Sequence, residues 1–335
     1  MKICMIGTGY VGLVSGTCFA DIGHQVYCVD KDVSKINKLN LGISPIYEPG
    51  LAELIKKNHK AKRLHFTSNL KKAITVSDII FICVGTPNIK GSLKVNLSFV
   101  FKCTKEILSI TKKKKIIVTK STVPVGTGDQ IENIIKKKRK LFSVISNPEF
   151  LREGEAIRDF KYPDRIVIGS NNKNEFKIMK KLYSPLINKG AKFFSTSRRG
   201  AELIKYASNA FLATKITFIN EIANLCEKSG INVEDIALGI GSDTRIGSRF
   251  LRPGPAYGGS CFPKDTKGLV SAAEKFKTNL SIVKSVIKSN QDRVNLLIKR
   301  VHKILGNNLR GKKISILGVT FKPNTDDMRD STSLK

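Results

Sequence analysis

The sequence of 335 residues lacks long apolar runs and paired cysteines. No stretch approaches the roughly 20 apolar residues that cross a bilayer. A strand-like pattern begins at Lys2, so we expect no signal peptide, no membrane association and a cytoplasmic protein. The seven cysteines are scattered singly, without the spacing of metal ligands. We therefore expect reduced thiols and no metal site.

Acidic residues are also scarce, with 27 Asp and Glu against 59 Lys and Arg, which gives a net charge of +32. Such an excess can indicate a protein that binds nucleic acid or another polyanion. However, the basic stretches 112–115 and 136–140 contain no interleaved aromatic residues on which bases could stack. We expect a solvated lysine-rich surface and no nucleic-acid partner. A polyanion binder remains the alternative class, and it predicts salt-dependent affinity for DNA.

The hydrophobic content of 41% is sufficient for two domains without disulfide or metal support. In the first half of the chain, short apolar runs alternate with segments of helical period, which is typical of a doubly wound parallel sheet. An α/β fold with an N-terminal Rossmann-like domain over residues 1–197 is predicted. The runs predicted as strands are 2–6, 25–29, 78–84, 115–119, 143–146, 165–169 and 191–195.

The second half is predicted to be mainly helical. Residues 199–229 contain no proline, keep apolar residues three and four apart, and end at Gly230, which indicates one long connecting helix. A central helical domain over 198–305 follows, with helical spacing at 233–238 and 266–305 around a loop rich in Gly and Pro.

Residues 312–319 have the pattern of a buried strand, and such a strand needs neighbours on both sides. Because the sequence supplies no further strand after it, we expect 306–335 to be the incomplete start of a second Rossmann-like domain. We also expect that an incomplete last domain weakens the activity of the protein.

A glycine-rich turn, Gly7-Thr8-Gly9-Tyr10-Val11-Gly12, connects the first strand to a helix. Gly7 permits the tight turn, Gly9 allows a pyrophosphate to approach the backbone, and Gly12 allows helix and strand to pack closely. The free N–H groups of the helix N-terminus attract the anion. Asp30, at the end of the second strand, can bind both ribose hydroxyls and repel a 2′-phosphate. NAD is therefore the predicted cofactor, although Lys31 and Lys35 leave NADP as the alternative.

The loop 253–265 carries the one cysteine with an evident route to reactivity, Cys261. Its glycines allow close backbone approach, and Lys264 and Asp265 are charged neighbours. A thiol near a lysine and backbone N–H donors ionises more readily. A lone cysteine is otherwise most often inert packing.

Several long motifs, in register over almost the whole chain, resemble those of the UDP-glucose dehydrogenases within the UDP-glucose/GDP-mannose dehydrogenase family. They are GTGYVG (7–12), KSTVPVGT (120–127), SNPEFLREG (146–154), AELIKYASNAFLATKI (201–216), GGSCFPKD (258–265) and GVTFKPNTDDMR (318–329). Glu155 and Ala256 depart from the usual residues within these motifs.

The resemblance implies oxidation of UDP-glucose to UDP-glucuronate with two NAD, in two steps through a thiohemiacetal and a thioester on Cys261. Lys205 and Asn209, four apart on the long helix, are then expected to stabilise the oxyanion at C6. Thr122 and Glu153 match residues that hold a catalytic water and transfer a proton, with Glu149 nearby and Asp265 assisting the base.

The same resemblance assigns binding residues and a homodimer formed through the long helix. The cofactor contacts that it adds to the glycine turn and Asp30 are Val11, Lys35, Thr122, Glu153, Lys264 and Arg329. The implied substrate contacts are Glu149, Phe150, Leu151, Arg152, Glu153, Lys205, Asn209, Phe250, Leu251, Arg252, Pro253, Gly254, Gly258 and Lys322. An inactive NAD-binding remnant and a dehydrogenase of another UDP-hexose remain alternatives.

Overall fold

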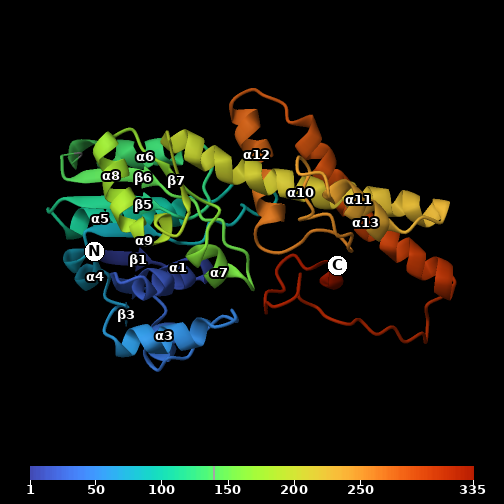
Figure 1. Cartoon of the computed structure of the whole chain (residues 1–335), viewed down its shortest axis with the longest axis horizontal. Coiled ribbons are helices and arrows are strands. Elements are labelled where there is room, and N and C mark those ends of the chain that lie inside the picture. The colour runs from blue at the N-terminus through green and yellow to red at the C-terminus, as the bar shows by residue number, and fades with distance from the viewer. Residues whose placement is uncertain (139) are drawn as a thin grey trace. The chain divides into compact units, whose positions relative to one another are not determined.

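A computed structural model describes residues 1–138 and 140–335, so Arg139 of the second basic stretch lies outside the described residues. The chain divides into two compact units, Met1–Lys205 and Tyr206–Lys335 (Figure 1). The three-domain division expected from the sequence stays a prediction.

The first unit is built on an eight-stranded sheet with the order β3-β2-β1-β4-β5-β6-β7-β8. The first six positions have the order of a doubly wound dinucleotide-binding sheet. All neighbours pair in parallel except β6 and β7, which share one antiparallel pair, Ser146 with Gly169. The predicted α/β class is confirmed. The strands are β1 (Lys2–Ile6), β2 (Gln25–Val29), β3 (Leu64–Thr67), β4 (Ile79–Ile82), β5 (Lys115–Thr119), β6 (Phe142–Ser146), β7 (Arg165–Gly169) and β8 (Lys192–Thr196).

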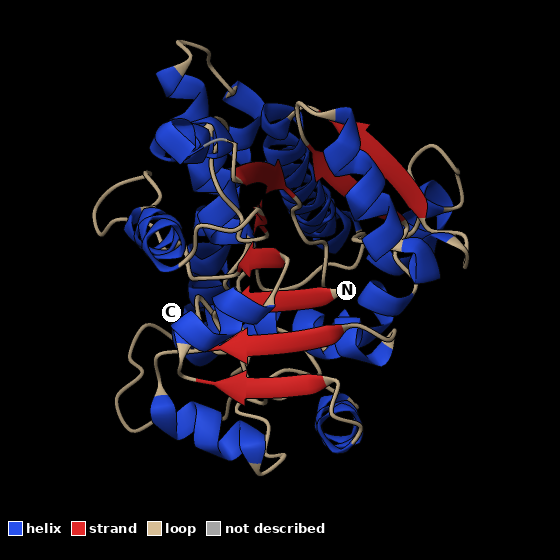
Figure 2. Cartoon of the chain, turned by 90° about the vertical axis from the view of Figure 1, so that its left-hand side faces the viewer, coloured by secondary structure: helices blue, strands red, loops and turns tan. Residues whose placement is uncertain are grey.

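Alternate residues of the strands fill two separate cores, one on each face of the sheet. In β1, Ile3 and Met5 belong to one core, and Cys4 and Ile6 belong to the other. Helices lie on both sides of the strands in Figure 2. The first core takes residues from α1 (Tyr10–Asp21), α2 (Val33–Asn40), α3 (Leu51–Lys60), α7 (Ala156–Lys161), α8 (Lys173–Leu182) and α9 (Ser184–Ile187). The second takes residues from α4 (Leu70–Val76), α5 (Ser98–Ile110) and α6 (Thr127–Ile135), which is followed by the 3-10 turn Lys136–Lys138.

The sequence reasoning missed one strand of this sheet, β3. Its four residues bury only Leu64 and Phe66, while His65 and Thr67 remain partly exposed. A stretch this short, with polar residues at alternate positions, does not stand out from the surrounding loop. Its place beside β2 follows from the pairing and not from its own composition.

Helix α10 (Arg198–Ser229) starts in the first unit and ends in the second, which agrees with the predicted long helix. The second unit also contains α11 (Val233–Gly241), α12 (Phe262–Lys275), α13 (Ser281–Leu305) and a 3-10 turn at Thr332–Leu334. The helical region predicted over 266–305 is interrupted between α12 and α13. There Lys277 adopts φ +55° and the Thr278 N–H donates to the Ala273 carbonyl, a closure that ends a helix.

The strand predicted at 312–319 is wrong, because this segment has no strand structure. Its apolar side chains are exposed, and Leu317 reaches 97%. Among the residues that the structure describes, none pairs with it as a neighbouring strand. A buried-type strand pattern forms a strand only when other strands are available to pair with it.

No helix in the described part of the chain is both long and apolar enough to cross a membrane.

Candidate active site

The glycine-rich turn between β1 and α1 leaves space for a ligand. Gly7 has φ +99°, and a Cβ atom there would lie 2.9 Å from the Cys83 carbonyl oxygen. A Cβ atom on Gly12 would lie 1.9 Å from the Gly7 carbonyl oxygen. By contrast, nothing lies within 4 Å of the Cβ position of Gly9, the N-cap of α1. The backbone is therefore open at the position where the motif requires close approach of a pyrophosphate.

Asp30 follows β2 and is fixed beside this turn. Its Oδ2 atom accepts hydrogen bonds from the N–H of Thr8 at 2.9 Å and from its hydroxyl at 2.8 Å, and Lys35 Nζ lies 3.3 Å away. Burial alone raises the pKa of the Asp30 carboxyl, but the hydrogen bonds from Thr8 and Asp32, together with the Lys35 ammonium, bring it below its ordinary value. The group is thus ionised at neutral pH. The sequence reasoning had assigned no role to Thr8.

We predict that Asp30→Ala weakens NADH binding by about 10-fold to 100-fold, since hydrogen bonds from the ribose to a charged group are lost. The preference over NADPH is expected to shrink, because no carboxylate then repels the 2′-phosphate. Both dissociation constants are measured by NADH and NADPH fluorescence titration. Asp32→Asn is the control, because it removes a nearby charge and keeps an N-cap residue for α2. An unchanged ratio of the two constants in Asp30→Ala contradicts the role given to Asp30.

A buried ion pair joins the loop after β6 to the first turns of α10. Lys205 Nζ lies 3.1 Å from Glu149 Oε1, and both side chains are only 5% exposed. The other carboxylate oxygen of Glu149 accepts the Leu151 N–H at 2.6 Å. Lys205 Nζ also lies 5.4 Å from the centre of the Phe150 ring. The structure thus brings together four of the predicted site residues, with a fixed cation and a fixed carboxylate.

A second buried lysine, Lys120, opens the KSTVPVGT segment after β5. Its Nζ atom lies 3.5 Å from Asn147 Oδ1 and 3.5 Å from the Tyr183 hydroxyl. Burial lowers the pKa of Lys120 to about 8, against the opposing influence of Cys83 and Glu149. The neighbouring Thr122 is partly exposed, and its carbonyl accepts a hydrogen bond from the Thr86 hydroxyl at 2.8 Å.

The loop that contains Glu153 is held by Glu48, a residue that the sequence reasoning missed. Glu48 accepts hydrogen bonds from the N–H of Gly154 and of Ala156, each at 2.7 Å, and from the hydroxyl of Tyr10. Glu48 lies in a loop without a recognisable motif, so nothing in the sequence indicates this bracing role.

The charged residues of this loop differ in their partners and in their exposure. The Arg152 guanidinium is engaged by Asp159 at 2.6 and 3.0 Å and by Glu155 at 2.6 Å. Glu155, which departs from the usual motif, is therefore paired. Glu153 itself is 8% exposed.

Cys261 lies in the second unit and is partly exposed, whereas the other six cysteines of the chain are buried. Burial raises the pKa of Cys83 to about 12, so a thiol of this kind is inert at neutral pH. Cys261 is the N-cap residue of α12, and its carbonyl accepts the first helical hydrogen bond, from the Asp265 N–H at 2.8 Å. Its sulfur therefore sits at the positive end of a helix dipole, which stabilises a thiolate.

Asp265 is fully buried one turn into α12. Its Oδ2 atom accepts a hydrogen bond from Asn209 Nδ2 at 2.6 Å, and its Oδ1 atom pairs with Lys264. Three predicted site residues to which the sequence assigned different roles, Asn209, Lys264 and Asp265, are therefore in contact. The amide of Asn209 is fixed in orientation by this carboxylate.

The glycines before Cys261 are in close contact with the segment 318–331. A Cβ atom on Gly258 would lie 2.4 Å from the Asp330 carbonyl oxygen, and one on Gly259 would lie 2.6 Å from the Phe321 ring. This segment includes the predicted substrate residue Lys322. The predicted cofactor residue Arg329 is 66% exposed and pairs with Asp327 at 2.8 Å.

The predicted substrate residues 250–254 form an irregular loop in the second unit. Phe250 has a left-handed backbone with φ +66°, which is uncommon for a residue with a large side chain. The side chain of Leu251 is buried and Arg252 is exposed, so the two point to different environments. Backbone groups of this loop are held by side chains of α10 and α13, which the sequence reasoning did not identify.

Comparisons with known proteins agree with this reading of the residues. Residues 1–187 match the NAD binding domain of the UDP-glucose/GDP-mannose dehydrogenase family, and 199–292 match its central domain. A UDP-glucose 6-dehydrogenase of Rhizobium meliloti is 54% identical over 100% of this chain and 77% of its own length.

Solved structures give the same result. A UDP-glucose dehydrogenase from Pyrobaculum islandicum has a TM-score of 0.94 at 36% identity, over 99% of this chain and 77% of that one. A GDP-mannose dehydrogenase from Pseudomonas aeruginosa has a TM-score of 0.70 at 34% identity, over 100% and 77%. The open glycine turn and the fixed Asp30 fit NAD, the cofactor of the matched domain. The chain therefore belongs to the UDP-glucose/GDP-mannose dehydrogenase family and is an NAD-dependent oxidoreductase.

Proposed function

We propose that this protein oxidises UDP-glucose to UDP-glucuronate in two steps that remove four electrons in total. The observation that carries this proposal is the position of Cys261, a partly exposed thiol at the N-terminus of α12, in a chain with an NAD-binding turn. Oxidation of an alcohol to an aldehyde needs no nucleophile, whereas oxidation of the aldehyde to the acid requires a nucleophile to add to its carbon, and a thiolate can serve. The names of the similar proteins support UDP-glucose as the substrate.

NAD, when bound, accepts one hydride in each oxidation, so two NAD are used per sugar. Gly9 and the N-terminus of α1 hold its pyrophosphate, and Asp30 binds the ribose hydroxyls. Val11, Lys35, Thr122, Glu153, Lys264 and Arg329 complete the proposed contacts.

In the first oxidation the C6 alcohol loses a proton and a hydride and becomes an aldehyde. Glu153 and Thr122 hold a water molecule that carries the proton away, and Glu149 and Asp265 support this transfer. Lys205 and Asn209 donate to the C6 oxygen as negative charge develops there. The buried pairs Lys205–Glu149 and Asn209–Asp265 support this role, because they fix both donors before reaction.

In the second oxidation the Cys261 thiolate forms a bond to C6 of the aldehyde, and the oxygen takes up a proton to give a thiohemiacetal. Loss of a second hydride and of the hydroxyl proton gives a thioester. Water then attacks C6, the carbon–sulfur bond breaks, and the carboxylate leaves the regenerated thiol. The covalent bond retains the aldehyde between the two steps.

The proposal predicts two NADH per UDP-glucose consumed, with UDP-glucuronate as the only sugar product. NADH absorbance and mass spectrometry of the nucleotide sugars measure both quantities. UDP-N-acetylmannosamine and GDP-mannose serve as matched substrates and should be turned over about 100-fold more slowly, because missing or misplaced polar contacts are costly. Faster turnover of either contradicts the substrate assignment. NAD binding without NADH formation identifies an inactive NAD-binding protein instead.

We further infer that two copies of the chain pair through α10. Phe211, Phe218 and Leu225 are 66%, 49% and 63% exposed and recur every seven residues on this helix. Such spacing places three large apolar side chains on one face, where a symmetric copy of the same helix can cover them. A second copy is the proposed occupant, because in a two-fold symmetric pair the same apolar stripe of each helix covers that of the other.

The variant Phe211→Glu/Phe218→Glu is expected to be monomeric, because two buried charges are costly at an apolar interface. Light scattering after gel filtration should give twice the 37.0 kDa chain mass for the unaltered protein and the single mass for the variant. Lys228→Glu, an exposed change on the same helix, is the control and should remain a dimer. A monomeric unaltered protein contradicts the inference.

A further inference from the structure

The loop that leads to Cys261 is irregular, and its backbone is held by side chains rather than by secondary structure. At Gly254 both backbone groups are engaged. The Gly254 N–H donates to Asn220 Oδ1 at 2.8 Å, and Arg293 Nε donates to the Gly254 carbonyl at 3.1 Å. Asn220 belongs to α10 and Arg293 to α13, so one residue of the loop is fixed by two helices.

Three residues further along, Asn290 of α13 holds Tyr257 in the same way. Its Oδ1 atom accepts the Tyr257 N–H at 2.8 Å, and its Nδ2 atom donates to the Tyr257 carbonyl at 3.0 Å. A single side-chain amide therefore replaces the pair of hydrogen bonds that a neighbouring strand would supply. No other uncharged side chain of this length offers a donor and an acceptor in that arrangement.

The contact continues from Tyr257 to the reactive cysteine. The Tyr257 ring is 5% exposed and packs edge-on against Phe262, with ring centres 6.1 Å apart and planes at 88°. Phe262 follows Cys261 directly and is the first residue of α12. Tyr257 is thus in direct contact with the residue that follows the reactive cysteine.

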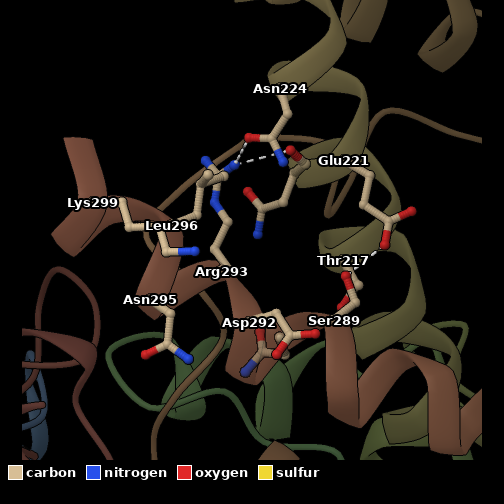
Figure 3. Close-up of a pocket in the computed structure, with 11 residues that line it drawn as sticks. Thr217, Glu221, Asn224, Ser289, Asp292, Arg293, Asn295, Leu296 and Lys299 are labelled. Carbon is tan, nitrogen blue, oxygen red and sulfur yellow. Dashed lines mark hydrogen bonds between the residues drawn. The ribbon is translucent and has the colours of Figure 1, made fainter. Parts of the chain in front are cut away.

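The side chains that provide this support line a polar pocket of about 400 Å³ between α10 and α13. Arg293 and Asn224 point toward one another across it, and the guanidinium donates to the Asn224 amide oxygen (Figure 3). Burial lowers the pKa of Arg293, helped by the nearby Arg300. Polar groups so engaged with the backbone have a bracing role rather than an unused one.

We propose that Asn290 and Arg293 are positioning residues, which hold the loop 254–260 so that Cys261 is oriented for attack on the substrate carbon. The inference rests on the proposed function, because it assigns the covalent step to Cys261. Displacing a reacting group by about 1 Å can cost about 100-fold in rate, so a loop without regular structure needs such support.

The test compares Asn290→Leu, which removes both hydrogen bonds, with Asn295→Leu, an exposed asparagine of α13 that lines the same pocket. In Asn290→Leu we expect kcat for UDP-glucose oxidation to fall by about 10-fold to 100-fold, with the KM for NAD unchanged. Asn295→Leu should keep kcat within about twofold. Equal kcat values in the two variants overturn the proposal.

Asn290→Asp separates positioning from general damage to the fold. The carboxylate keeps the acceptor but faces the Tyr257 carbonyl without a donor, whereas its protonated form regains both hydrogen bonds. We therefore expect kcat of Asn290→Asp, relative to the unaltered enzyme, to recover as the pH falls from 8 toward 5. A ratio that is independent of pH, with a lowered Tm throughout, indicates a purely structural role and overturns the proposal.

Hydrogen–deuterium exchange tests the brace without substrate. Peptides covering 255–261 should exchange about 10-fold faster in Asn290→Leu, because the Tyr257 N–H loses its acceptor, while β1–β5 peptides remain unchanged. If the unaltered protein fails to oxidise UDP-glucose, the proposed function fails. The exchange experiment still tests whether Asn290 holds the backbone of Tyr257. Unchanged exchange in 255–261 overturns the brace even if the enzyme is active.

Discussion

Replacing Cys261 by serine is expected to lower the formation of UDP-glucuronate by about 1,000-fold or more. A serine hydroxyl at a helix N-terminus is almost entirely protonated at neutral pH and is a far weaker nucleophile than a thiolate. The aldehyde is then not captured, and the second oxidation stops. Mass spectrometry of the nucleotide sugars after incubation with UDP-glucose and NAD measures this loss.

Cys103→Ser provides the matched control, because it makes the same chemical change at a buried thiol of α5. Burial raises the pKa of Cys103 to about 11, so its thiol has no part in chemistry at neutral pH. This variant should retain kcat within about threefold, with at most a modest loss of stability. Unchanged UDP-glucuronate formation by Cys261→Ser contradicts the covalent mechanism.

The second large effect is expected for Lys205→Met. The change removes a donor to the developing oxyanion, and loss of such a donor typically lowers kcat by about 100-fold to 1,000-fold. It also leaves Glu149 buried without this cation, which costs about 3 kcal/mol in the free energy of unfolding. Steady-state kinetics and urea unfolding measure the two effects separately.

Glu149→Gln/Lys205→Met separates catalysis from stability. An amide facing a thioether leaves no buried charge from the pair, so the free energy of unfolding should return close to that of the unaltered protein. Activity should stay low, because the donor to the oxyanion is still absent. Recovery of activity together with stability contradicts the role of Lys205 at the reacting oxygen.

The doubly wound sheet could be predicted because strands such as β1, β4 and β7 are buried on both faces and are therefore continuous apolar runs. β1, β2, β5 and β7 have the bounds predicted from the sequence. The long helix was predictable for a different reason, since residues 199–229 contain no proline and keep one apolar spacing throughout. In both cases the conformation that the local sequence favours is also the one that the tertiary contacts stabilise.

The remaining elements depend on distant partners. β3 is a strand because it pairs with β2, and its own four residues carry little signal. Residues 312–319 show the converse, because a strand-like pattern stays irregular where no described strand pairs with it. The break between α12 and α13 depends on the left-handed backbone of Lys277. Such a helix end is usually predicted from a glycine, and no glycine occupies this position.

The residues of the candidate site also fall into two groups, those that a local motif identifies and those that depend on distant contacts. Residues that contact ligands through a motif, such as Gly9, Asp30 and Cys261, could be identified because the motif ties residue type to chemistry. Residues that act by holding backbone could not. Glu48 and Asn290 are ordinary polar residues in a loop and on a helix, and only the fold brings each of them to the backbone that it braces.

The covalent mechanism is tested most directly by identifying the atom that bonds to the sugar. Enzyme incubated with UDP-glucose and NAD is quenched in acid during turnover, and its peptides are mapped by mass spectrometry. If Cys261 is the nucleophile, a sugar-nucleotide adduct is expected on the peptide that contains Cys261, absent in Cys261→Ser and present in Cys103→Ser. An adduct on another residue, or full conversion to UDP-glucuronate by an enzyme that never carries one, contradicts this mechanism.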